Sequence, residues 1–531
     1  MRDALKSENG KTLIKIELKI RGIEGVRGST DRPCTPKSLF HHSSSAFGSK
    51  SRSLASTKNA PAAADVPAGP PHLLVYPFLS SGHVIPLLDL ADRLLRRGVR
   101  VTALVTPSNH HLLLPLLSDH PDLFHPLVIP APDTPCLSKN FLIVKTLSMR
   151  HHHYPALLEW FRSHPSPPVA ILSDFFLGWT RHLALELGVP RIVFSPSAAF
   201  AVSIEFSLYQ NLPKNGGGDE NSTVTFGDVP NSPTYAWWQI SHLFRIYMEG
   251  EADMEFHREG WLANAASWGV VFNTFTELER VYVDHMKEKF GPDRVWAVGP
   301  LLPPVDDSVS LTSRGGSSSV PAEEVLKWLD GRKERSVVYV CFGSRTALEN
   351  DQMAALATAL EMSRVHFIWC VRETADGLVL GGHGLVPEGF ESRTAGRGLV
   401  IRGWAPQVAI LRHRAVGGFL THCGWNSVLE GISAGVVMLT WPMGADQYTD
   451  ATLLVDQLGV AIRACEAPDD AVPDPAELAR ALAESLDETR PERGRIKKLS
   501  EAAADAVNGG SSDKDLDGFV KSLAELQRVK K

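Results

Sequence analysis

From residue 72 onward, apolar runs of strand length alternate with amphipathic stretches of helix length, and this alternation constrains the fold more than any other feature. Residues 72–78 have the pattern of a buried strand, residues 84–97 repeat apolar side chains at helical spacing, and residues 99–105 again have a strand pattern. Strands joined through helices form βαβ units, in which the strands lie parallel in one sheet. The sequence therefore predicts an α/β fold.

The alternation runs through two groups of strands with a break between them. The further strands are expected at residues 169–172, 192–194, 270–272, 295–298, 336–342, 366–371, 399–401, 416–420 and 436–441. Between the groups, residues 303–320 are rich in Pro, Asp, Ser and Gly, which is typical of a linker. We therefore expect two doubly wound, Rossmann-like domains, residues 71–302 and 321–512, that face each other across a cleft. Residues 513–531 are expected to form a C-terminal helix that packs back on the first domain.

Residues 1–70 differ in composition from the rest of the chain. The first 71 residues hold 12 Lys and Arg against 6 Asp and Glu, whereas the 531-residue chain has a formal net charge of −6. A Ser-rich stretch without acidic residues between Asp31 and Asp65 partly resembles a transit peptide, but the acidic residues before it do not. The leader is therefore a targeting segment, a disordered extension or a mis-joined exon. We expect a cytoplasmic protein, or a plastid one if the leader is a transit peptide.

Composition excludes several classes of protein. With 44% hydrophobic and 21% charged residues, the chain is neither fibrous nor disordered as a whole, and its net negative charge argues against a nucleic-acid partner. No run approaches the about 18 apolar residues of a membrane-spanning helix, so no integral membrane segment is expected. The six cysteines form no CxxC pair, which predicts a reducing compartment and no zinc site. We expect a monomer.

Chemistry-bearing residues are concentrated in residues 404–447, which read WAPQVAILRHRAVGGFLTHCGWNSVLEGISAGVVMLTWPMGADQ. In the middle of this segment a predicted strand is followed by a turn and an amphipathic helix. Gly424 permits a close approach of the backbone to a ligand. The free N–H groups of Asn426 and Ser427 at the start of the helix favour a diphosphate, and His422 adds a donor from the turn.

Three further residues fit a nucleotide ligand. Glu430 lies four residues after Asn426 on the same helix face, where its carboxylate can accept hydrogen bonds from ribose hydroxyls. Ser344 follows the first strand of the second domain and can contact a phosphate, although a helix cap explains it equally well. Trp404 can stack on a base or simply pack in the core.

Residues 404–447 resemble, without a gap, the 44-residue signature of plant secondary-product UDP-glycosyltransferases, and the resemblance extends from about residue 71 to the C-terminus. It implies a GT-B fold and an enzyme that transfers a sugar from a UDP-sugar, with inversion, to a small hydroxyl-bearing acceptor. It also implies a set of UDP-sugar-binding residues: Ser344, Trp404, Ala405, Gln407, His422, Gly424, Trp425, Asn426, Ser427, Glu430, Asp446 and Gln447.

The resemblance gives these residues their roles. It implies that Trp404 stacks on uracil, Ala405 contacts uracil through its backbone and Gln407 lies near the nucleoside. Asp446 and Gln447 are implied to hold the sugar hydroxyls. A final Gln is associated in this family with glucose, so Gln447 favours UDP-glucose as the donor. Trp425 is implied to shape the sugar end of the pocket.

A candidate general base follows the first predicted strand. His83 lies at the start of a helix, whose positive end favours a neutral imidazole, and a neutral imidazole suits the removal of a hydroxyl proton near neutral pH. Asp174 ends another strand of the same sheet. From the residues alone, a hydrogen-bonded turn histidine and a helix-capping aspartate remain open. Residues 80–86, SSGHVIP, match the SxGHxxP context of the family, which implies that His83 is the general base and Asp174 its orienting partner.

The acceptor is the part that the sequence defines least. The aromatic stretch Tyr235, Trp237, Trp238, Phe244 and Tyr247 suits a flat phenolic or terpenoid acceptor, or packs in the core. The wider pattern resembles the branch of the family that acts on flavonols and related phenolics.

Other donors and functions also remain open. UDP-galactose or UDP-rhamnose, and a non-catalytic UDP-sugar-binding protein, are the alternatives. No G-x-G-x-x-G follows a strand, which argues against a dinucleotide-dependent oxidoreductase. No metal or other cofactor is expected, because helix N–H groups, His422 and Ser344 can compensate the diphosphate charge.

Overall fold

The computed structural model describes residues 69–131, 140–303, 318–372, 385–468 and 470–529. Almost all of the leader expected at residues 1–70 and most of the linker expected at 303–320 lie outside the described residues. Among the residues described, no helix is both long and apolar enough to cross a membrane.

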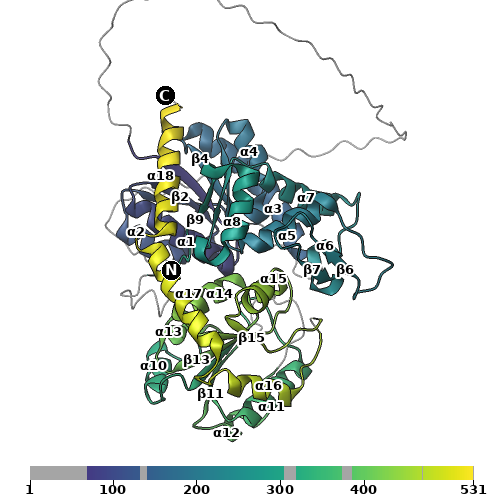
Figure 1. Cartoon of the computed structure of the whole chain (residues 1–531). Helices are drawn as coiled ribbons and strands as arrows, with labels where there is room; N and C mark the ends of the chain where they lie inside the picture. Colours follow the sequence, from purple (N-terminus) through teal and green to yellow (C-terminus); the bar gives the residue numbers. More distant parts are fainter. Residues whose placement is uncertain (1–68, 132–139, 304–317, 373–384, 469, 530–531) are drawn as a thin grey trace, which may run out of the picture. The chain divides into compact units, whose positions relative to one another are not determined.

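The first half of the chain is built on a seven-stranded parallel sheet, shown in Figure 1, with the strand order β3-β2-β1-β4-β5-β8-β9. Its strands are β1 (His72–Tyr76), β2 (Arg100–Val105), β3 (Phe124–Val128), β4 (Ala170–Asp174), β5 (Arg191–Ser195), β8 (Gly269–Phe272) and β9 (Val295–Ala297). The helices of this half are α1 (Ser81–Arg96), α2 (Leu114–Asp119), α3 (Phe141–Ser163), α4 (Thr180–Leu187), α5 (Ala199–Asn211), α6 (His242–Arg245), α7 (Ala252–Ala265) and α8 (Thr276–Phe290). A separate antiparallel pair is formed by β6 (Thr223–Thr225) and β7 (Thr234–Ala236).

The second half is built on a six-stranded parallel sheet in the order β12-β11-β10-β13-β14-β15. Its strands are β10 (Val337–Cys341), β11 (His366–Val371), β12 (Gly398–Arg402), β13 (Val416–Thr421), β14 (Val437–Thr440) and β15 (Ala461–Arg463). Its helices are α10 (Ala322–Asp330), α11 (Asn350–Ser363), α12 (Phe390–Arg393), α13 (Gln407–Arg412), α14 (Trp425–Ala434), α15 (Gln447–Thr452), α16 (Pro475–Glu484), α17 (Pro491–Val507) and α18 (Ser511–Val529).

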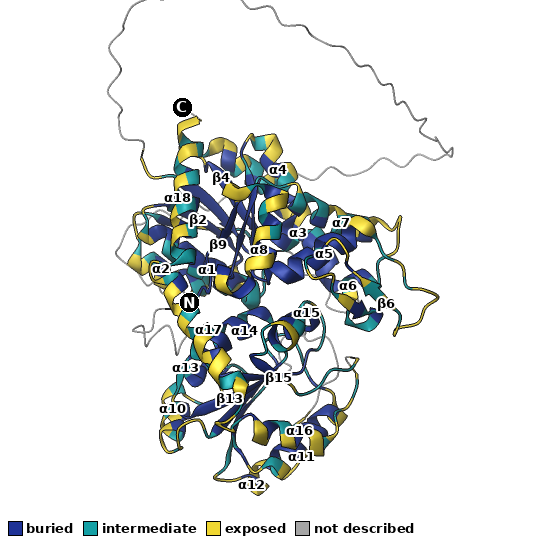
Figure 2. Cartoon of the chain, viewed as in Figure 1, coloured by how far each residue is buried: buried dark blue, intermediate teal, exposed yellow. Residues whose placement is uncertain are grey.

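The central strands are buried along their whole length, as the dark blue strands of Figure 2 show. A parallel sheet covered by helices on both faces requires apolar residues on both faces of each strand, which explains the continuous apolar runs of the sequence. Every strand that the sequence predicts is present, with ends that differ by at most a few residues. The prediction of an α/β fold with two doubly wound sheets is confirmed.

Several short or exposed strands escaped the sequence-based prediction. The edge strand β3 contains Pro126 and is largely exposed, because a proline without an N–H is tolerated at a sheet edge. Three others, β6, β7 and β15, are three residues long. None of these carries the long apolar run by which a buried strand is recognised.

The last helix, α18, lies against the first sheet (yellow in Figure 1). Asp515 Oδ2 accepts a hydrogen bond from the backbone N–H of Ala297 in β9 at 2.9 Å. The ring of Phe519 packs on Trp296, with 4.9 Å between ring centroids. Arg97, just after α1, forms ion pairs with Asp513 and Asp517. The end of the chain is thus part of the first half's core.

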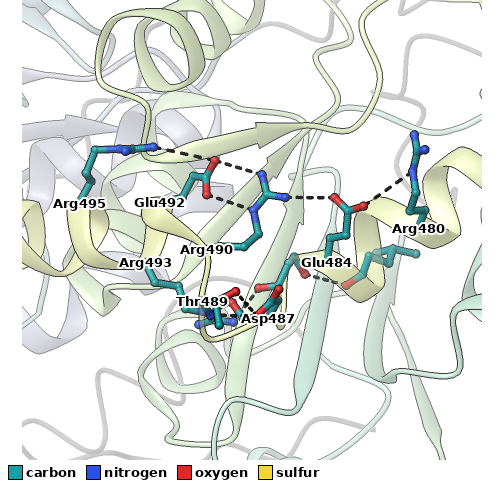
Figure 3. Close-up of polar contacts among 10 residues, drawn as sticks. Arg480, Glu484, Asp487, Thr489, Arg490, Glu492, Arg493 and Arg495 are labelled. Carbon is teal, nitrogen blue, oxygen red and sulfur yellow. Dashed lines mark hydrogen bonds and ion pairs between the residues drawn. The ribbon is translucent and has the colours of Figure 1, made fainter.

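A polar network holds the connection between α16 and α17, shown in Figure 3. Arg490 lies between two carboxylates and donates to Glu484 at 3.0 Å and to Glu492 at 3.0 and 3.1 Å. Arg493 donates to the carbonyl oxygens of Ser485 and Asp487. The two bonds from Arg493 satisfy backbone carbonyl oxygens just after α16, where the helix itself offers no donor.

In each sheet the strand order reverses once, between β1 and β4 and between β10 and β13. Ligands of doubly wound sheets bind at such switch points, beyond the carboxyl ends of the strands. His83 follows β1 and Asp174 ends β4, while Ser344 follows β10 and His422 follows β13. Each pair of predicted site residues therefore comes from the two loops that flank a switch point.

Candidate active site

A cavity of about 760 Å³ is lined by residues from the loops of both sheets. His83 and every residue predicted to bind the UDP-sugar line it: Ser344, Trp404, Ala405, Gln407, His422, Gly424, Trp425, Asn426, Ser427, Glu430, Asp446 and Gln447. Asp174 does not line the cavity, because it is fully buried behind His83. Residues separated by up to 364 positions in the sequence are thus brought into one site.

His83 and Asp174 form a hydrogen-bonded pair at the wall of the cavity. His83 Nδ1 lies 2.7 Å from Asp174 Oδ2, and Asp174 Oδ1 accepts the backbone N–H of Phe176 at 2.9 Å. An ionised carboxylate fixes the imidazole in the tautomer with the proton on Nδ1. Nε2 then carries the free lone pair, which is the atom that a general base needs.

Three aromatic rings enclose the imidazole of His83. The centroids of Phe78, Phe175 and Phe176 lie 5.5, 5.6 and 5.1 Å from that of the imidazole. The side chain of His83 remains 14% exposed. These rings hold the imidazole in place and limit its access to water, while its exposed part is on the cavity side.

His422 is packed between two glycines. A Cβ atom on either Gly343 or Gly424 would come within 2.5 Å of His422 Nε2, and Gly343 has a φ of +74°. Burial lowers the pKa of His422 to about 4, so the ring is neutral at pH 7. In the described structure His422 Nδ1 has no hydrogen-bond partner, although it is buried. The ring is thus a neutral group with an unused polar atom beside the start of α14.

The first turn of α14 bonds to the loop that carries His83. Asn426 Nδ2 donates to the carbonyl oxygen of Gly82 at 2.7 Å. Trp425 Nε1 donates to the carbonyl oxygen of Asn273, which follows β8, at 2.6 Å. Trp425 is 3% exposed and therefore anchors α14 to the first sheet in addition to lining the cavity.

The residues predicted for the nucleoside form a connected group. Gln407 Nε2 donates to Glu430 Oε2 at 2.6 Å and to Ser427 Oγ at 3.0 Å, and Gln407 Oε1 accepts from Tyr339 at 3.1 Å. Gln407 thus orients the carboxylate of Glu430. The side chain of Trp404 is partly exposed and lines the cavity, so it is available for stacking.

The residues predicted for the sugar lie at the start of α15. Ser197 donates a hydrogen bond to Asp446, and Gln447 Oε1 accepts the N–H of Met443 at 2.8 Å. Burial raises the pKa of Asp446, and the bond from Ser197 opposes this effect. Ser195, in contrast, donates to the carbonyl oxygen of Ser197 and does not line the cavity.

Three of the five residues of the aromatic stretch considered for the acceptor lie in the core instead, while Trp238 and Tyr247 are partly exposed and do not line the cavity either. Tyr235, Trp237 and Phe244 are 4, 7 and 4% exposed, and none of them lines the cavity. The apolar lining of the first half comes from other elements: Phe141, Leu142, Phe175, Phe176, Val202, Leu243 and Trp261. Sequence reasoning missed these residues because they come from α3, α5, α6, α7 and the turn that follows β4, and form no local motif.

Glu205 is a polar residue of the cavity that sequence reasoning also missed. It lines the cavity from α5, on the same helix face as Ala201 and Val202. Burial and, to a smaller extent, the nearby carboxylate of Asp446 raise the pKa of Glu205 to about 8. A neutral carboxyl group therefore faces the cavity at pH 7. The only signal in the sequence was that Glu205 lies four and three residues after Ala201 and Val202, which places all three on one helix face.

Two doubly wound parallel sheets whose switch-point loops share one cavity have the architecture of the GT-B fold found in glycosyltransferases. Residues 299–470 match the family model described as UDP-glucoronosyl and UDP-glucosyl transferase. UDP-glycosyltransferase 89B2 of Stevia rebaudiana is 50% identical over 472 residues, which cover 87% of this chain and 99% of the relative. Flavonol 3-O-glucosyltransferase UGT89B1 of Arabidopsis thaliana is 50% identical over 470 residues, 86% of this chain and 96% of the relative. The chain belongs to the plant family 1 UDP-glycosyltransferases and is an enzyme of that family.

A solved relative matches in structure as well. Arabidopsis thaliana UGT89C1 complexed with UDP-L-rhamnose has a TM-score of 0.70 and 38% identity, and the match covers 86% of this chain and 100% of that chain. The same relative complexed with quercetin has a TM-score of 0.68 and 37% identity, covering 86% and 99% of the two chains. The resemblance inferred from residues 404–447 is thereby confirmed at the level of family and fold.

Proposed function

We propose that this enzyme transfers glucose from UDP-glucose to a hydroxyl group of a flavonol-like phenolic, with inversion at the anomeric carbon. The observation that supports this most directly is the 2.7 Å bond between His83 and Asp174 at the wall of the cavity that all the predicted UDP-sugar-binding residues line. A positioned base and a nucleotide-sugar site in one cavity are what such a transfer needs.

In the proposed reaction, His83 Nε2 takes the proton of the acceptor hydroxyl as the oxygen attacks the anomeric carbon. The new bond joins the acceptor oxygen to that carbon, while the bond from the carbon to the diphosphate breaks and UDP leaves with the electron pair. Asp174 stabilises the imidazolium that forms. Because attack and departure occur on opposite faces, an α-linked donor gives a β-glycoside.

The diphosphate needs compensation of its charge as it leaves. We propose that the free N–H groups at the start of α14 provide it, together with His422 and Ser344. This scheme uses no metal ion. Addition of EDTA to the purified enzyme should therefore leave the rate of transfer unchanged, and a loss restored by Mg²⁺ or Mn²⁺ would contradict it.

Glucose is favoured as the donor by Gln447 and by the glucosyltransferase named among the relatives at 50% identity. UDP-rhamnose is the second candidate, because a solved relative binds UDP-L-rhamnose. The flavonol acceptor is supported by the aromatic lining around Phe175, Phe176 and Trp261, by the flavonol glucosyltransferase relative and by the relative solved with quercetin.

The purified full-length enzyme can be tested with UDP-glucose, UDP-galactose and UDP-rhamnose against quercetin, with products detected by mass. We expect a hexoside from UDP-glucose at the highest rate. His83→Ala should lower kcat/KM by about 10²–10⁴-fold while UDP binding, measured by calorimetry, is retained. UDP binding by the wild type without transfer from any donor would identify a binding protein instead.

A further inference from the structure

A buried arginine lies directly behind the pair of His83 and Asp174. Arg191, the first residue of β5, is 2% exposed. Its Nε donates to Ser173 Oγ at 2.9 Å, and its Nη2 donates to the backbone carbonyl oxygen of Asp174 at 3.2 Å. Ser173 and Asp174 are the last two residues of β4. Arg191 therefore holds the end of the strand that carries the aspartate.

The same guanidinium also holds the backbone next to Asp174. Arg191 Nη1 donates to Asn264 Oδ1 at 2.7 Å and to Ser267 Oγ at 2.9 Å. Asn264 in turn donates to the carbonyl oxygen of Phe175 at 2.8 Å. Phe175 is one of the rings that enclose His83. Through these bonds Arg191 supports both the carboxylate and the aromatic wall of the proposed base.

Among the described residues, the four hydrogen-bond acceptors of Arg191 are neutral oxygens: Ser173 Oγ, Asp174 O, Asn264 Oδ1 and Ser267 Oγ. A buried cation is costly unless an anion lies near it. Burial lowers the pKa of Arg191 to about 9, and the negative charge of Asp174 opposes that effect, so the guanidinium stays charged at neutral pH. The negative charge of Asp174 thus favours the charged form of the buried Arg191.

We propose that Arg191 is a positioning residue for the transfer reaction, which holds the end of β4 and acts as the counter-ion of Asp174 so that His83 remains neutral and able to accept a proton. A carboxylate buried against an imidazole favours the protonated imidazolium, which cannot act as a base. A cation beside that carboxylate reduces this effect. The proposal rests on the proposed function, in which His83 is the base.

Other charged groups also face this cluster. Asp446, at the start of α15, interacts electrostatically with His83, and this interaction opposes the burial that raises the pKa of Asp446. Arg181, on α4, adds a second positive charge near Arg191. Glu205 lies near Asp446 and is mainly neutral at pH 7 because burial raises its pKa to about 8. Arg191 is the cation that bonds directly to the strand end of Asp174, so its removal should have the largest effect.

The test is the pH dependence of kcat/KM for transfer from UDP-glucose to quercetin. Arg191→Met removes the charge and keeps most of the apolar volume. We expect the acid limb of its profile to move upward by up to about 1 pH unit, because a nearby positive charge disfavours the imidazolium and its removal makes protonation of His83 easier. At pH values below the acid limb, kcat/KM should fall up to about 10-fold relative to wild type, and the two profiles should converge at higher pH. A uniform loss at every pH, with the acid limb unmoved, would overturn the proposal.

Two controls separate charge from packing. Ser267→Ala removes one neutral acceptor and no charge, and it should leave the acid limb in place. In an Asp174→Asn background, Arg191→Met should cause no further shift of the acid limb, because the carboxylate charge that Arg191 balances is already absent. A shift of equal size in that background would show that Arg191 does not act through Asp174.

Folding is checked by UDP binding and by Tm. If Arg191→Met does not fold, Arg191→Lys carries the test, because it keeps the charge: its acid limb should stay within about 0.3 pH units of wild type. A shift of a full unit in Arg191→Lys would overturn the proposal. Absence of transfer by the wild type would instead contradict the proposed function itself.

Discussion

Asn426 and Gly82 connect the two sheets of the enzyme at the centre of the site: the side-chain amide of Asn426 donates to the carbonyl oxygen of Gly82 at 2.7 Å. Asn426 lies in the first turn of α14, which we propose receives the diphosphate, and Gly82 immediately precedes His83. The proposed donor site and the proposed base are therefore joined by one hydrogen bond.

Asn426→Ala removes this bond, so we expect His83 to be held less firmly. The kcat for glucosyl transfer should fall about 10-fold or more, because a misplaced catalytic group is costly even when it remains present. UDP affinity should fall less, since the backbone N–H groups of α14 remain. Steady-state kinetics and calorimetry measure the two effects. Ser433→Ala, near the end of the same helix, is the control and should match wild type; an equal loss in kcat and UDP affinity would contradict the coupling.

Gly343→Ala should abolish most of the affinity for UDP. Its new Cβ would lie within 2.5 Å of His422 Nε2, and the residue has a φ of +74°. Gly98→Ala is a matched control, because Gly98 has a φ of +77° but no atom within 4 Å of the added Cβ. We expect calorimetry to show at least a roughly 10-fold loss of UDP affinity for Gly343→Ala and none for Gly98→Ala. Similar affinities in the two variants would show that His422 does not contribute to donor binding.

Glu205 should make acceptor binding depend on pH. With a pKa of about 8, its carboxyl group is protonated at pH 7 and becomes charged as the pH rises through 8. The ionised carboxylate of Glu205 is repelled by Asp446 and binds water. The KM for quercetin should therefore rise about 3–10-fold between pH 7 and 9, which is the size of a modest polar mismatch. Glu205→Gln stays neutral and should show a flat KM.

The exposed Glu259, on α7, gives the control for that experiment. Glu259→Gln should retain the rise of the wild type. A rise in KM that persists in Glu205→Gln would assign the pH effect to ionisation of the acceptor itself.

Arg490 should contribute measurably to stability, because it bonds two carboxylates at the same time and its side chain is 27% exposed. Arg490→Ala should lower the free energy of unfolding by about 1 kcal/mol, the size expected for a partly exposed network and reduced by salt. Arg480, also shown in Figure 3, has one ion pair at 3.8 Å and is 70% exposed, so Arg480→Ala should change stability by less than about 0.5 kcal/mol. Urea unfolding of both variants tests this, and equal losses would contradict it.

Much of the fold could be predicted because each buried parallel strand is a continuous apolar run, which can be recognised without knowing its neighbours in the sheet. The run at 337–341 is apolar on both faces, whereas β3 has Pro126 and three exposed residues, so the first was predicted and the second was not. The residues proposed to bind the UDP-sugar could also be selected from the sequence, because all of them except Ser344 lie in residues 404–447, and the structure places them in one cavity.

The residues proposed to contact the acceptor could not be predicted, because they are scattered along the sequence. Phe141, Glu205 and Trp261 come from three helices, and only the packing of those helices brings them to one wall. Sequence reasoning left the aromatic stretch around Trp237 open between acceptor contact and core packing, and the structure places Trp237 in the core. The bond from Trp425 to the carbonyl oxygen of Asn273 could not be predicted either, because every residue type has a backbone carbonyl.

The position of α18 has a mechanical consequence. After the second sheet the chain returns to the first half at α18, which is fastened to β9 by Asp515 and Phe519. The covalent connection between α17 and α18 therefore ties the second half to the first. If the cavity widens to admit a donor, this connection limits how far the two halves can separate where α17 meets α18.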